Sequence, residues 1–535
     1  MNYTYDNDSR LTQVIDPTGT YAFTFDNMGR LTNTSSSYAF LTGRHFTTAY
    51  TYDAASNRTG FTDPESGSTA YVYDTLNRLQ TLTPPTAFVS SGNFGFGYDV
   101  LSRRTSLTRP NSVSTAYTYD DLSRLLSVTH TKGATTLDGA SYTVDNAGNR
   151  QSRTALPGTT ATNFTYDNIY ELLTAKQGST TQESYTYDPV GNRLTDLGSG
   201  TWSYNTSNEL NSRPSYSYTY DPNGNTLTSV VTAGTTTYAW DFENRLSSVT
   251  LPGSGGIVTF KYDPFGRRIY KSSSSATSVY AYDGDNLVEE TNGAGGVVAR
   301  YEQTQNIDEP LAMLRSSTTS YFHADGLGSV TSLSNSAGSI ANTYTYDSFG
   351  KLTASTGSLV NPFQYTARES DSETGLYYYR ARYYDPNAGR FLSEDPIGFD
   401  GGHNFYAYVR NNPILYLDPS GLITCGDKIR KRLNDLAGII GKNECNPGSD
   451  PFSGAGKFTK DEGGHKNYEF VSAGMSTDDY KRIIGMLNDL NNNLLGKGPR
   501  FGGTLGALHV TSSGGTFSAD GQNWTVTVEI GRAHV

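Results

Sequence analysis

The chain contains only two cysteines among its 535 residues, Cys425 and Cys445, and both lie in its last quarter. A disulfide framework therefore cannot hold the rest of the chain together. The pair is compatible with one local disulfide or with two free thiols, and the sequence leaves both open. No apolar run approaches the roughly 18 residues that suggest a membrane span. The first residues, MNYTYDNDSR, lack the basic and apolar regions of a signal peptide.

Charged and hydrophobic residues are also scarce, at 17% and 35%, against about 25% and 45–50% in average globular domains. Because Glu, Lys, Leu and Ala build helices, this composition argues against a large helical protein. Aromatic residues reach 12%, which argues against disorder. The 40 Tyr and 56 Gly, with abundant Ser, Thr and Asn, indicate many short strands joined by tight turns.

Positive charge is in deficit over most of the chain. Residues 1–422 carry a net charge of −12, whereas residues 423–528 carry about +1. An acidic body disfavours general nucleic-acid binding by residues 1–422. Nucleic acid therefore stays open as a partner of the C-terminal region alone.

A repeated unit fills the acidic part. It reads roughly Tyr-x-Tyr-Asp-x-x-x-Arg-Leu-Thr, as in YTYDNDSRLT (3–12), YTYDDLSRLL (117–126) and YTYDSFGKLT (344–353). The early copies of its Asp follow each other at steps of 20–27 residues. The copies are Asp6, Asp26, Asp53, Asp74, Asp99, Asp120, Asp145, Asp167 and Asp188, and later Asp221, Asp241, Asp263, Asp283 and Asp347.

Each repeat predicts one β-hairpin. Tyr-x-Tyr places two aromatic rings on one face of a strand, Asp begins a turn, and the Arg-Leu-Thr segment begins the next strand. Since a single hairpin cannot bury its own face, the hairpins are expected to pair into one continuous, curling sheet. We expect the repeated Asp and Arg to tie adjacent turns together. The Tyr stripe favours cross-strand packing, with glycan binding as the alternative.

These residues resemble the Rhs/YD-repeat family, which includes bacterial Rhs toxins, the C component of insecticidal toxin complexes, wall-associated contact toxins and animal teneurins. The resemblance covers residues 1–422 and implies a mainly β fold, with hairpins coiled into a hollow shell that encloses a C-terminal toxin. The predicted parts are the shell (1–360), an Rhs-associated core (361–422) and a small α+β domain (423–528). Because the chain starts within a repeat, we expect natural N-terminal residues to be missing and one end of the shell to be open.

The core segment carries the most specific resemblance, through GLYYYRARYYDP, GRFLSEDPIG, NFYAYVRNNP and DPSGL. It is similar to the bacterial toxin branch, which implies an intramolecular aspartic protease that cleaves after the last Leu of DPSGL, between Leu422 and Ile423. The positions that match the family's protease residues are Asp395, Asp418 and Arg382. The first motif ends in Phe399 where Leu is common, which leaves the carboxylate unchanged.

Two adjacent carboxylates suit this chemistry, because like charges in close contact share one proton. The ionised partner activates water, and the protonated partner polarises the scissile carbonyl group. Arg382 is expected to hold one carboxylate ionised through paired hydrogen bonds. Asp-Pro-x-Gly is also an ordinary turn sequence, and we interpret the neighbouring Asp385-Pro386 as a turn.

The character of the sequence changes after Leu422. Helices are expected at 423–442 and about 480–495, a loop from Asn443 to about Lys466, a strand at 505–511, and a hairpin that turns at Asp520–Gly521. No CxxC pair, P-loop or HExxH motif assigns an activity. The polar candidates for a nuclease or another acid/base site are His465, Lys466, Glu469 and His509.

Two further segments need an interpretation. His323 and Asp325 in YFHADGLGSV have the spacing of half a metal site, but a turn is favoured, and no metal or cofactor is predicted. Residues 529–535, EIGRAHV, are encoded by GAG ATC GGA AGA GCA CAC GTC, the start of a common sequencing adapter. We therefore expect these seven residues to be an assembly artefact.

The leading hypothesis is a secreted or surface-delivered bacterial polymorphic toxin that serves interbacterial competition. Its shell would enclose its own C-terminal domain and cleave itself, and its expected partners are an immunity protein and a secretion or delivery apparatus. The alternative is a non-enzymatic surface or adhesion protein whose repeats bind glycans or proteins. DPIGF and DPSGL favour the toxin, because an adhesin needs no release site before a new domain.

Overall fold

The computed structural model describes residues 1–198 and 200–422, together with five strand segments at 425–426, 456–462, 465–473, 508–512 and 523–531. The chain divides into two units, Met1–Cys425 and Gly426–Val535. The predicted boundary between Leu422 and Ile423 stays a prediction. Among the described residues, no helix has the length and apolar character needed to cross a bilayer.

The first unit is almost wholly β. Its first sheet has 17 strands, each antiparallel to its neighbours in sequence. They are β1 (Asn2–Tyr5), β2 (Leu11–Asp16), β3 (Gly19–Phe25), β4 (Leu31–Tyr38), β5 (Phe46–Tyr52), β6 (Arg58–Thr62), β7 (Ser68–Tyr73), β8 (Leu79–Thr83), β9 (Phe94–Tyr98), β10 (Arg104–Thr108), β11 (Val113–Tyr119), β12 (Leu125–Lys132), β13 (Thr135–Val144), β14 (Arg150–Ala155), β15 (Ala161–Tyr166), β16 (Leu172–Gln177) and β17 (Thr180–Ser184).

A two-stranded and a 16-stranded antiparallel sheet continue the series. Their strands are β18 (Thr186–Tyr187), β19 (Arg193–Thr195), β20 (Ser203–Tyr204), β21 (Leu210–Arg213), β22 (Tyr216–Tyr220), β23 (Thr226–Val231), β24 (Gly234–Trp240), β25 (Leu246–Thr250), β26 (Ile257–Tyr262), β27 (Arg268–Ser272), β28 (Thr277–Asp283), β29 (Asn286–Asn292), β30 (Val297–Gln303), β31 (Pro310–Arg315), β32 (Thr318–Ala324), β33 (Val330–Ser334), β34 (Ile340–Tyr346) and β35 (Leu352–Thr356).

The prediction of one unbroken sheet is therefore wrong at two places, on either side of β18–β19. Backbone bonds still span the gaps, from Tyr185 N to Leu173 O and from Trp202 N to Leu194 O, both 2.8 Å long. The second gap contains the sequence DLGSGT (196–201), whose two glycines are unfavourable in a strand. The hairpin series itself, with one hairpin for each repeat, is confirmed.

The repeat Asp organises each turn as predicted. In the first turn, Asp6 Oδ1 accepts the amides of Asp8 and Arg10 at 2.9 Å, and Arg10 Nε donates to Asp6 Oδ2 at 2.7 Å. Arg10 Nη1 then reaches the Asp26 carbonyl oxygen of the next turn, at 3.2 Å. Arg30 repeats both contacts toward Asp26 and Asp53. Where a turn carries both Asp and Arg, these side chains thus form a ladder that links successive hairpins.

The fourth residue of these turns takes a left-handed backbone. It is Gly29 in the second turn, with φ +79°, and Asn77 in the fourth, with φ +56°. Gly and Asn reach this region at little steric cost, which explains why they recur between the Asp and the Arg.

The second Tyr of each repeat fixes the spacing between hairpins. Its hydroxyl group donates to the backbone carbonyl of the residue after the preceding turn, as in Tyr52 to Leu31 at 2.8 Å and Tyr187 to Leu172 at 2.9 Å. Trp240 takes the same place and donates through Nε1 to Thr226 O at 2.7 Å. The hydroxyl groups of these tyrosines are thus bonded within the sheet. This favours cross-strand packing over glycan binding as the role of the Tyr stripe.

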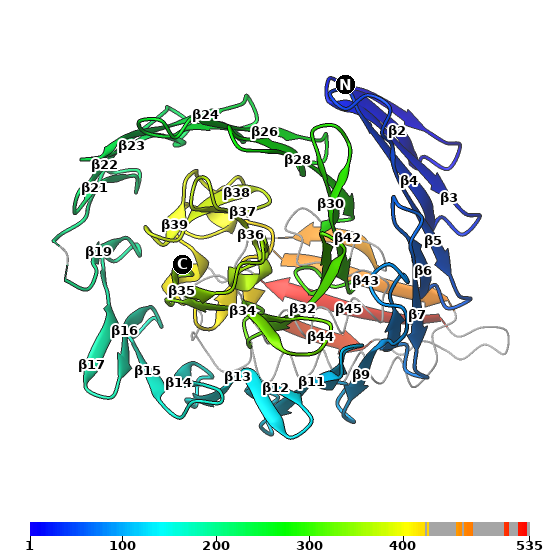
Figure 1. The fold of residues 1–535 in the computed structure, drawn as a ribbon, viewed down its shortest axis with the longest axis horizontal. Coiled ribbons are helices and arrows are strands. Elements are labelled where there is room, and N and C mark those ends of the chain that lie inside the picture. The colour runs from blue at the N-terminus through cyan, green and yellow to red at the C-terminus, as the bar shows by residue number, and fades with distance from the viewer. Residues whose placement is uncertain are drawn as a thin grey trace. The chain divides into compact units, whose positions relative to one another are not determined.

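Within the first unit, the strands curve round from β2 through β12, β16 and β23 to β28, and β30–β34 then lie within that curve (Figure 1). Apolar side chains fill the contact between them. Val14 and Tyr21 pack with Ile269 and Val279 in one cluster, and Leu82 packs with Leu311 and Ala312 in another. The predicted coil of hairpins is thereby confirmed.

The core segment adds a four-stranded sheet, short 3-10 helices and a last strand. They are η1 (Tyr365–Ala367), β36 (Glu369–Asp371), β37 (Leu376–Tyr379), β38 (Arg382–Asp385), β39 (Arg390–Phe391), η2 (Gly398–Asp400), η3 (Val409–Asn411) and β40 (Tyr416–Leu417). Tyr377 and Tyr379 join one buried cluster, and Tyr378 joins another. The aromatic run LYYY is thus buried on both faces of its strand, as an unbroken apolar pattern requires.

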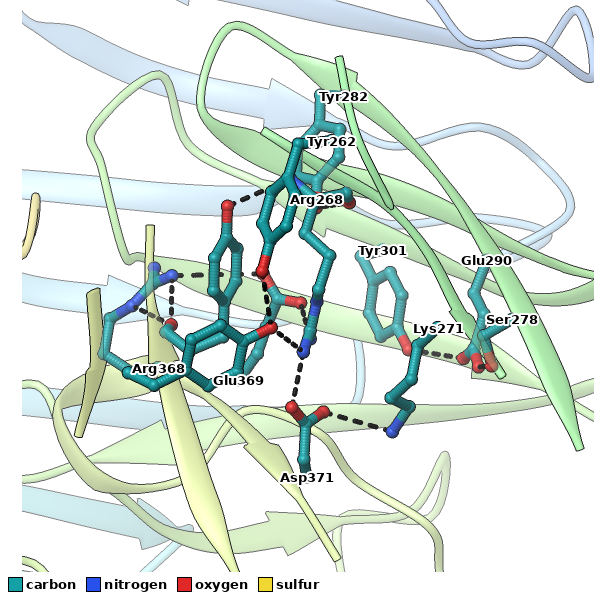
Figure 2. Close-up of polar contacts among 12 residues, drawn as sticks. Tyr262, Arg268, Lys271, Ser278, Tyr282, Glu290, Tyr301, Arg368, Glu369 and Asp371 are labelled. Atoms are coloured by element: carbon teal, nitrogen blue, oxygen red, sulfur yellow. Dashed lines mark hydrogen bonds and ion pairs between the residues drawn. The ribbon is translucent and has the colours of Figure 1, made fainter. Parts of the chain in front are cut away.

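A buried ion network joins this small sheet to the wall of the shell. Arg268 of β27 donates to Asp371 Oδ2 at 2.5 Å and to Glu369 Oε2 at 2.9 Å. Lys271 Nζ reaches Asp371 Oδ1 at 3.1 Å. Figure 2 shows Arg268 between the two carboxylates of β36, with tyrosine rings around it.

The second unit contains a four-stranded antiparallel sheet in the order β42-β43-β45-β44. Its strands are β42 (Gly456–Glu462), β43 (His465–Ala473), β44 (Leu508–Ser512) and β45 (Asn523–Gly531), and β41 (Cys425–Gly426) precedes them. Strands near 508 and after Asp520–Gly521 were predicted. The helix expected at 423–442 is wrong at its start, where β41 is a strand. The rest of it and the helix expected at 480–495 lie outside the described residues, as do the side chains of Cys425 and Cys445.

The loop expected from Asn443 to about Lys466 is wrong in its second half, where β42 and the start of β43 form a hairpin. Glu462 pairs with His465, so two residues connect the strands, and both are glycines in the sequence. Gly-Gly is a strong hairpin signal, because two-residue turns need positive φ angles.

Candidate functional site

Three elements of the core segment bring the predicted protease residues together. Arg382 begins β38, Asp395 lies between β39 and η2, and Asp418 follows β40. One nitrogen of Arg382, Nη2, contacts Asp395 Oδ2 at 2.9 Å and Asp418 Oδ2 at 3.4 Å. All three side chains are buried.

The remaining contacts of Arg382 fix its plane. Nη1 donates to the Phe405 carbonyl oxygen at 2.8 Å, and Nε donates to the Gly421 carbonyl oxygen. The guanidinium group lies over the Phe391 ring, with Cζ 3.6 Å from the ring centroid. The sequence analysis missed the two phenylalanines, although Phe391 belongs to the motif GRFLSEDPIG.

Burial decides the electrostatics of the site. It raises the pKa of Asp395 to about 6, even though the Arg382 charge and the Ile397 amide both act to lower it. Burial also lowers the pKa of Arg382, against the opposing influence of Asp418 and then Asp395. A carboxyl group whose pKa is near 6 is still protonated in part of the molecules around neutral pH and can then act as a general acid.

Both motifs are also true Asp-Pro turns, so the two interpretations of their sequence hold together. Asp395 Oδ1 accepts the Ile397 amide at 3.1 Å, and Asp418 Oδ1 accepts the Leu422 amide at 3.0 Å. In each residue one oxygen closes the turn, while the other faces Arg382.

The residues just before the predicted cleavage position are therefore held from two sides. Asp418 holds the Leu422 amide, and Arg382 holds the Gly421 carbonyl. Gly421 has φ +74°, and a Cβ atom there would lie 2.2 Å from the Tyr379 carbonyl oxygen. Only glycine fits this position, which gives the Gly of DPSGL a steric reason. Ile423 lies outside the described residues.

Asp385, interpreted as a turn residue, does close a turn. Its Oδ1 accepts the Asn387 amide at 2.8 Å, and its carbonyl oxygen accepts the Gly389 amide at 2.8 Å. This third Asp-Pro of the core segment therefore provides a matched comparison for Asp395 and Asp418.

His323 and Asp325 have structural contacts. His323 is buried in β32, where its Nε2 lies 2.8 Å from Ser334 Oγ and burial lowers its pKa well below the ordinary value. Asp325 begins a turn and accepts the amides of Leu327 and Ser329. Within the described residues, no cluster of three or more His, Cys, Asp or Glu side chains is placed for a metal ion.

The four polar candidates of the C-terminal region fall in one sheet. His465, Lys466 and Glu469 belong to β43, and His509 belongs to β44, with β45 between the two strands. His509 pairs with Glu529. Glu529 lies in residues 529–535, whose origin from a sequencing adapter stays a prediction. The side chains of these four candidates are outside the described residues.

The comparisons with known proteins agree with these features. A family model for the teneurin YD-shell matches residues 159–414, and one for the RHS repeat matches residues 98–135. The chain belongs to the Rhs/YD-repeat family. Its Tyr-Asp hairpins are the repeats for which the family is named.

The relatives include a nuclease and two toxins. The tRNA3(Ser)-specific nuclease WapA of Bacillus spizizenii is 32% identical over 422 residues, which cover 76% of this chain and 16% of that protein. The toxin protein Tse5 of Pseudomonas aeruginosa is 41% identical over 19% of this chain and 8% of its own length. The double-stranded DNA deaminase toxin A of Burkholderia cenocepacia is 36% identical over 19% of this chain and 7% of its own length. The chain thus spans less than a fifth of these relatives.

Solved structures share the fold. The crystal structure of TcdB2-TccC3-Cdc42 matches with a TM-score of 0.67 at 18% identity, over 83% of this chain and 26% of that one. The Photorhabdus luminescens Tc holotoxin pore with the mutation TccC3-D651A matches with a TM-score of 0.62 at 19% identity, over 78% and 24%. At these identities, the similarity establishes the architecture of the shell.

Proposed function

We propose that this chain is the carrier part of a polymorphic toxin, which encloses a C-terminal effector and cuts itself between Leu422 and Ile423. The observation that carries the proposal is the meeting of Asp395 and Asp418 at one nitrogen of Arg382, beside the last residues before that bond. Cleavage would free the effector from the chain while the shell still retains it.

The reaction follows from the charges of the site. Asp395, with its pKa raised to about 6 by burial, supplies a proton to the Leu422 carbonyl oxygen as water attacks the carbonyl carbon. Asp418 accepts a proton from that water and passes it to the nitrogen of Ile423 when the carbon–nitrogen bond breaks, while Asp395 takes back a proton from a hydroxyl group of the intermediate. Arg382 compensates negative charge on the carboxylates throughout.

For the effector we propose a nucleic-acid substrate. Two observations support it: the printed activities of several relatives are tRNA cleavage and DNA deamination, and residues 423–528 lack the acidic excess of the shell. An immunity protein, a delivery apparatus and secretion to the cell surface belong to the same proposal. Incubating the cleaved chain with tRNA and duplex DNA, before and after partial unfolding of the shell, tests the substrate class.

The test of self-cleavage is a denaturing gel of the purified full chain with mass analysis of the fragments. The wild type should give two bands, the smaller one beginning at Ile423. Asp395→Asn and Asp418→Asn should each give one band, and Arg382→Ala should cleave slowly or not at all. Asp385→Asn is the matched control and should cleave normally. An uncut wild-type chain would refute the proposal.

A further inference from the structure

The turn between β37 and β38 lies against the chain just before Leu422. Residues 380–382 of the turn hold the successive carbonyl groups of residues 419–421. The bonds run from Arg380 Nη1 to Pro419 O, from Ala381 N to Ser420 O at 3.1 Å, and from Arg382 Nε to Gly421 O. The turn between β37 and β38 thus holds three successive carbonyl oxygens on the N-terminal side of the predicted cleavage bond, two through arginine side chains and one through the backbone.

We infer that Arg380, anchored by Asp308, is a substrate-positioning residue for self-cleavage, which sets the register of residues 419–421 relative to Asp395 and Asp418. The inference rests on the proposed function. It assigns to Arg380 a role separate from that of Arg382, whose guanidinium group faces the two carboxylates themselves.

The anchor is an ion pair brought together from distant parts of the chain. Arg380 Nη2 lies 2.8 Å from Asp308 Oδ1, and Arg380 Nη1 lies 3.3 Å from Asp308 Oδ2. Arg368 also donates to Asp308 Oδ1, at 2.5 Å, and its Nη2 reaches the Tyr378 carbonyl oxygen at 2.8 Å. Asp308 thus joins Arg380, which follows β37, to Arg368, which directly precedes β36.

The charge of Arg380 is maintained at this site. Burial opposes the charge, but Asp308, together with Asp285 and Glu369, holds the pKa of Arg380 above its ordinary value. Bidentate contact with a carboxylate also fixes the plane of a guanidinium group. The nitrogen that faces Pro419 therefore has a defined direction.

The backbone of the turn supports a specific role for the arginine. Tyr379 pairs with Arg382, so Arg380 and Ala381 form a two-residue hairpin turn. Arg380 has φ +57°, a region where glycine is the residue of lowest conformational cost. An arginine at this position is disfavoured by its backbone, so its side-chain contacts must offset that strain.

Positioning matters because residues 421–422 must bond Asp418 and fit against the Tyr379 carbonyl group at the same time. The Leu422 amide bonds Asp418 Oδ1 at 3.0 Å, and Gly421 fits closely under the Tyr379 carbonyl. A shift of the chain by a fraction of a residue would break the bond between the Leu422 amide and Asp418 and would change the position of the Leu422 carbonyl group. Misplacement of reacting groups by about 1 Å is enough to slow a reaction about 100-fold.

The decisive variant is Arg380→Gly, which removes the guanidinium group and also relieves the backbone strain. Cleavage would be followed during cell-free synthesis of the full chain, with timed samples on denaturing gels. We expect the rate constant to fall about 10- to 100-fold, with partial recovery in Arg380→Lys. Asp308→Asn should slow cleavage in the same direction. The smaller fragment should still begin at Ile423.

Arg315→Ala is the matched control. Arg315 is similarly buried and bonds Glu290 and Tyr301, away from residues 419–421, and this variant should cleave at the wild-type rate. Urea midpoints, measured in an Asp395→Asn background so that every chain is intact, compare the folding of Arg380→Gly and Arg315→Ala.

A folded Arg380→Gly chain that cleaves at the wild-type rate would overturn the inference while leaving the proposed protease intact. So would an Arg315→Ala chain that is slowed as much as Arg380→Gly. An uncut wild-type chain, by contrast, would overturn the proposed function and this inference with it.

Discussion

Replacing Arg268 by methionine should detach the core sheet from the shell wall more effectively than any surface change. Its guanidinium group is 1% exposed and pairs with Asp371, also 1% exposed, and with Glu369. Methionine keeps much of the aliphatic volume of the arginine side chain but removes its positive charge. The buried carboxylates of Asp371 and Glu369 then have less positive charge beside them. Lys271 remains beside Asp371, at 3.1 Å, and Arg368 remains 3.9 Å from Glu369.

Removing one partner of a buried pair costs about 3–5 kcal/mol, because the other charge is left buried. The first unit ends at Cys425, and an unfolding entropy of about 2.1 cal/mol/K per residue gives roughly 0.9 kcal/mol per kelvin for a unit of this size. The melting temperature of the shell should therefore fall by about 3–6 °C, if the unit unfolds cooperatively.

The assay is calorimetry or tyrosine fluorescence on the Asp395→Asn chain, so that all molecules are uncut. Arg245→Met is the control, since Arg245 and Asp241 form a partly exposed pair within one turn, with side chains 23% and 22% exposed, that should contribute at most about 1 kcal/mol. The double variant Arg268→Met with Asp371→Leu should recover part of the loss. A fall in melting temperature no larger for Arg268→Met than for Arg245→Met would refute the reasoning.

Three further outcomes follow from the same contacts. Because Asp395 must be protonated to act as the acid and its pKa is about 6, the self-cleavage rate should fall about tenfold per pH unit above pH 6; stopped-time gels that show a rate rising toward pH 8 would contradict this role. Tyr187→Phe should lower the free energy of unfolding by about 1 kcal/mol, measured by urea titration, because the Leu172 carbonyl loses its partner. Burial lowers the pKa of His130 to about 3, so the stability it contributes is complete above pH 6.5 and is lost as the pH falls toward 3. The drop in unfolding free energy from pH 7 to pH 5 should be about 2 kcal/mol smaller in His130→Gln than in the wild type.

The repeats could be predicted from the sequence because their structure is local. Tyr, Asp and Arg of one repeat make their main contacts within about one period, as the bonds of Arg10 to Asp6 and Asp26 illustrate. The interruptions beside β18–β19 were not predicted, since an isolated turn sequence does not show where pairing fails. The Gly-Gly hairpin after β42 was readable in principle and was missed.

The residues of the candidate site also fall into those that could be predicted from the sequence and those that could not. Asp395, Asp418 and Arg382 were found through motifs that resemble a known family, and their side chains meet. Asp308 lies 72 residues before Arg380, in a connection between two shell strands, and no local pattern marks it. Only the packing of the core sheet against the wall brings this carboxylate to the turn. Long-range ion pairs of this kind depend on the fold and are not encoded in a motif.

The ladder of turns has a consequence for how such a shell changes size. Arg10, Arg30, Arg78, Arg103 and Arg124 each bond their own turn and the following one, so these hairpins need only their immediate neighbours to be complete. Duplication or loss of a whole repeat would preserve every bond of the ladder, whereas a fractional insertion would leave an arginine without its next carbonyl. The wall can therefore lengthen or shorten in whole hairpins while its turn chemistry stays the same.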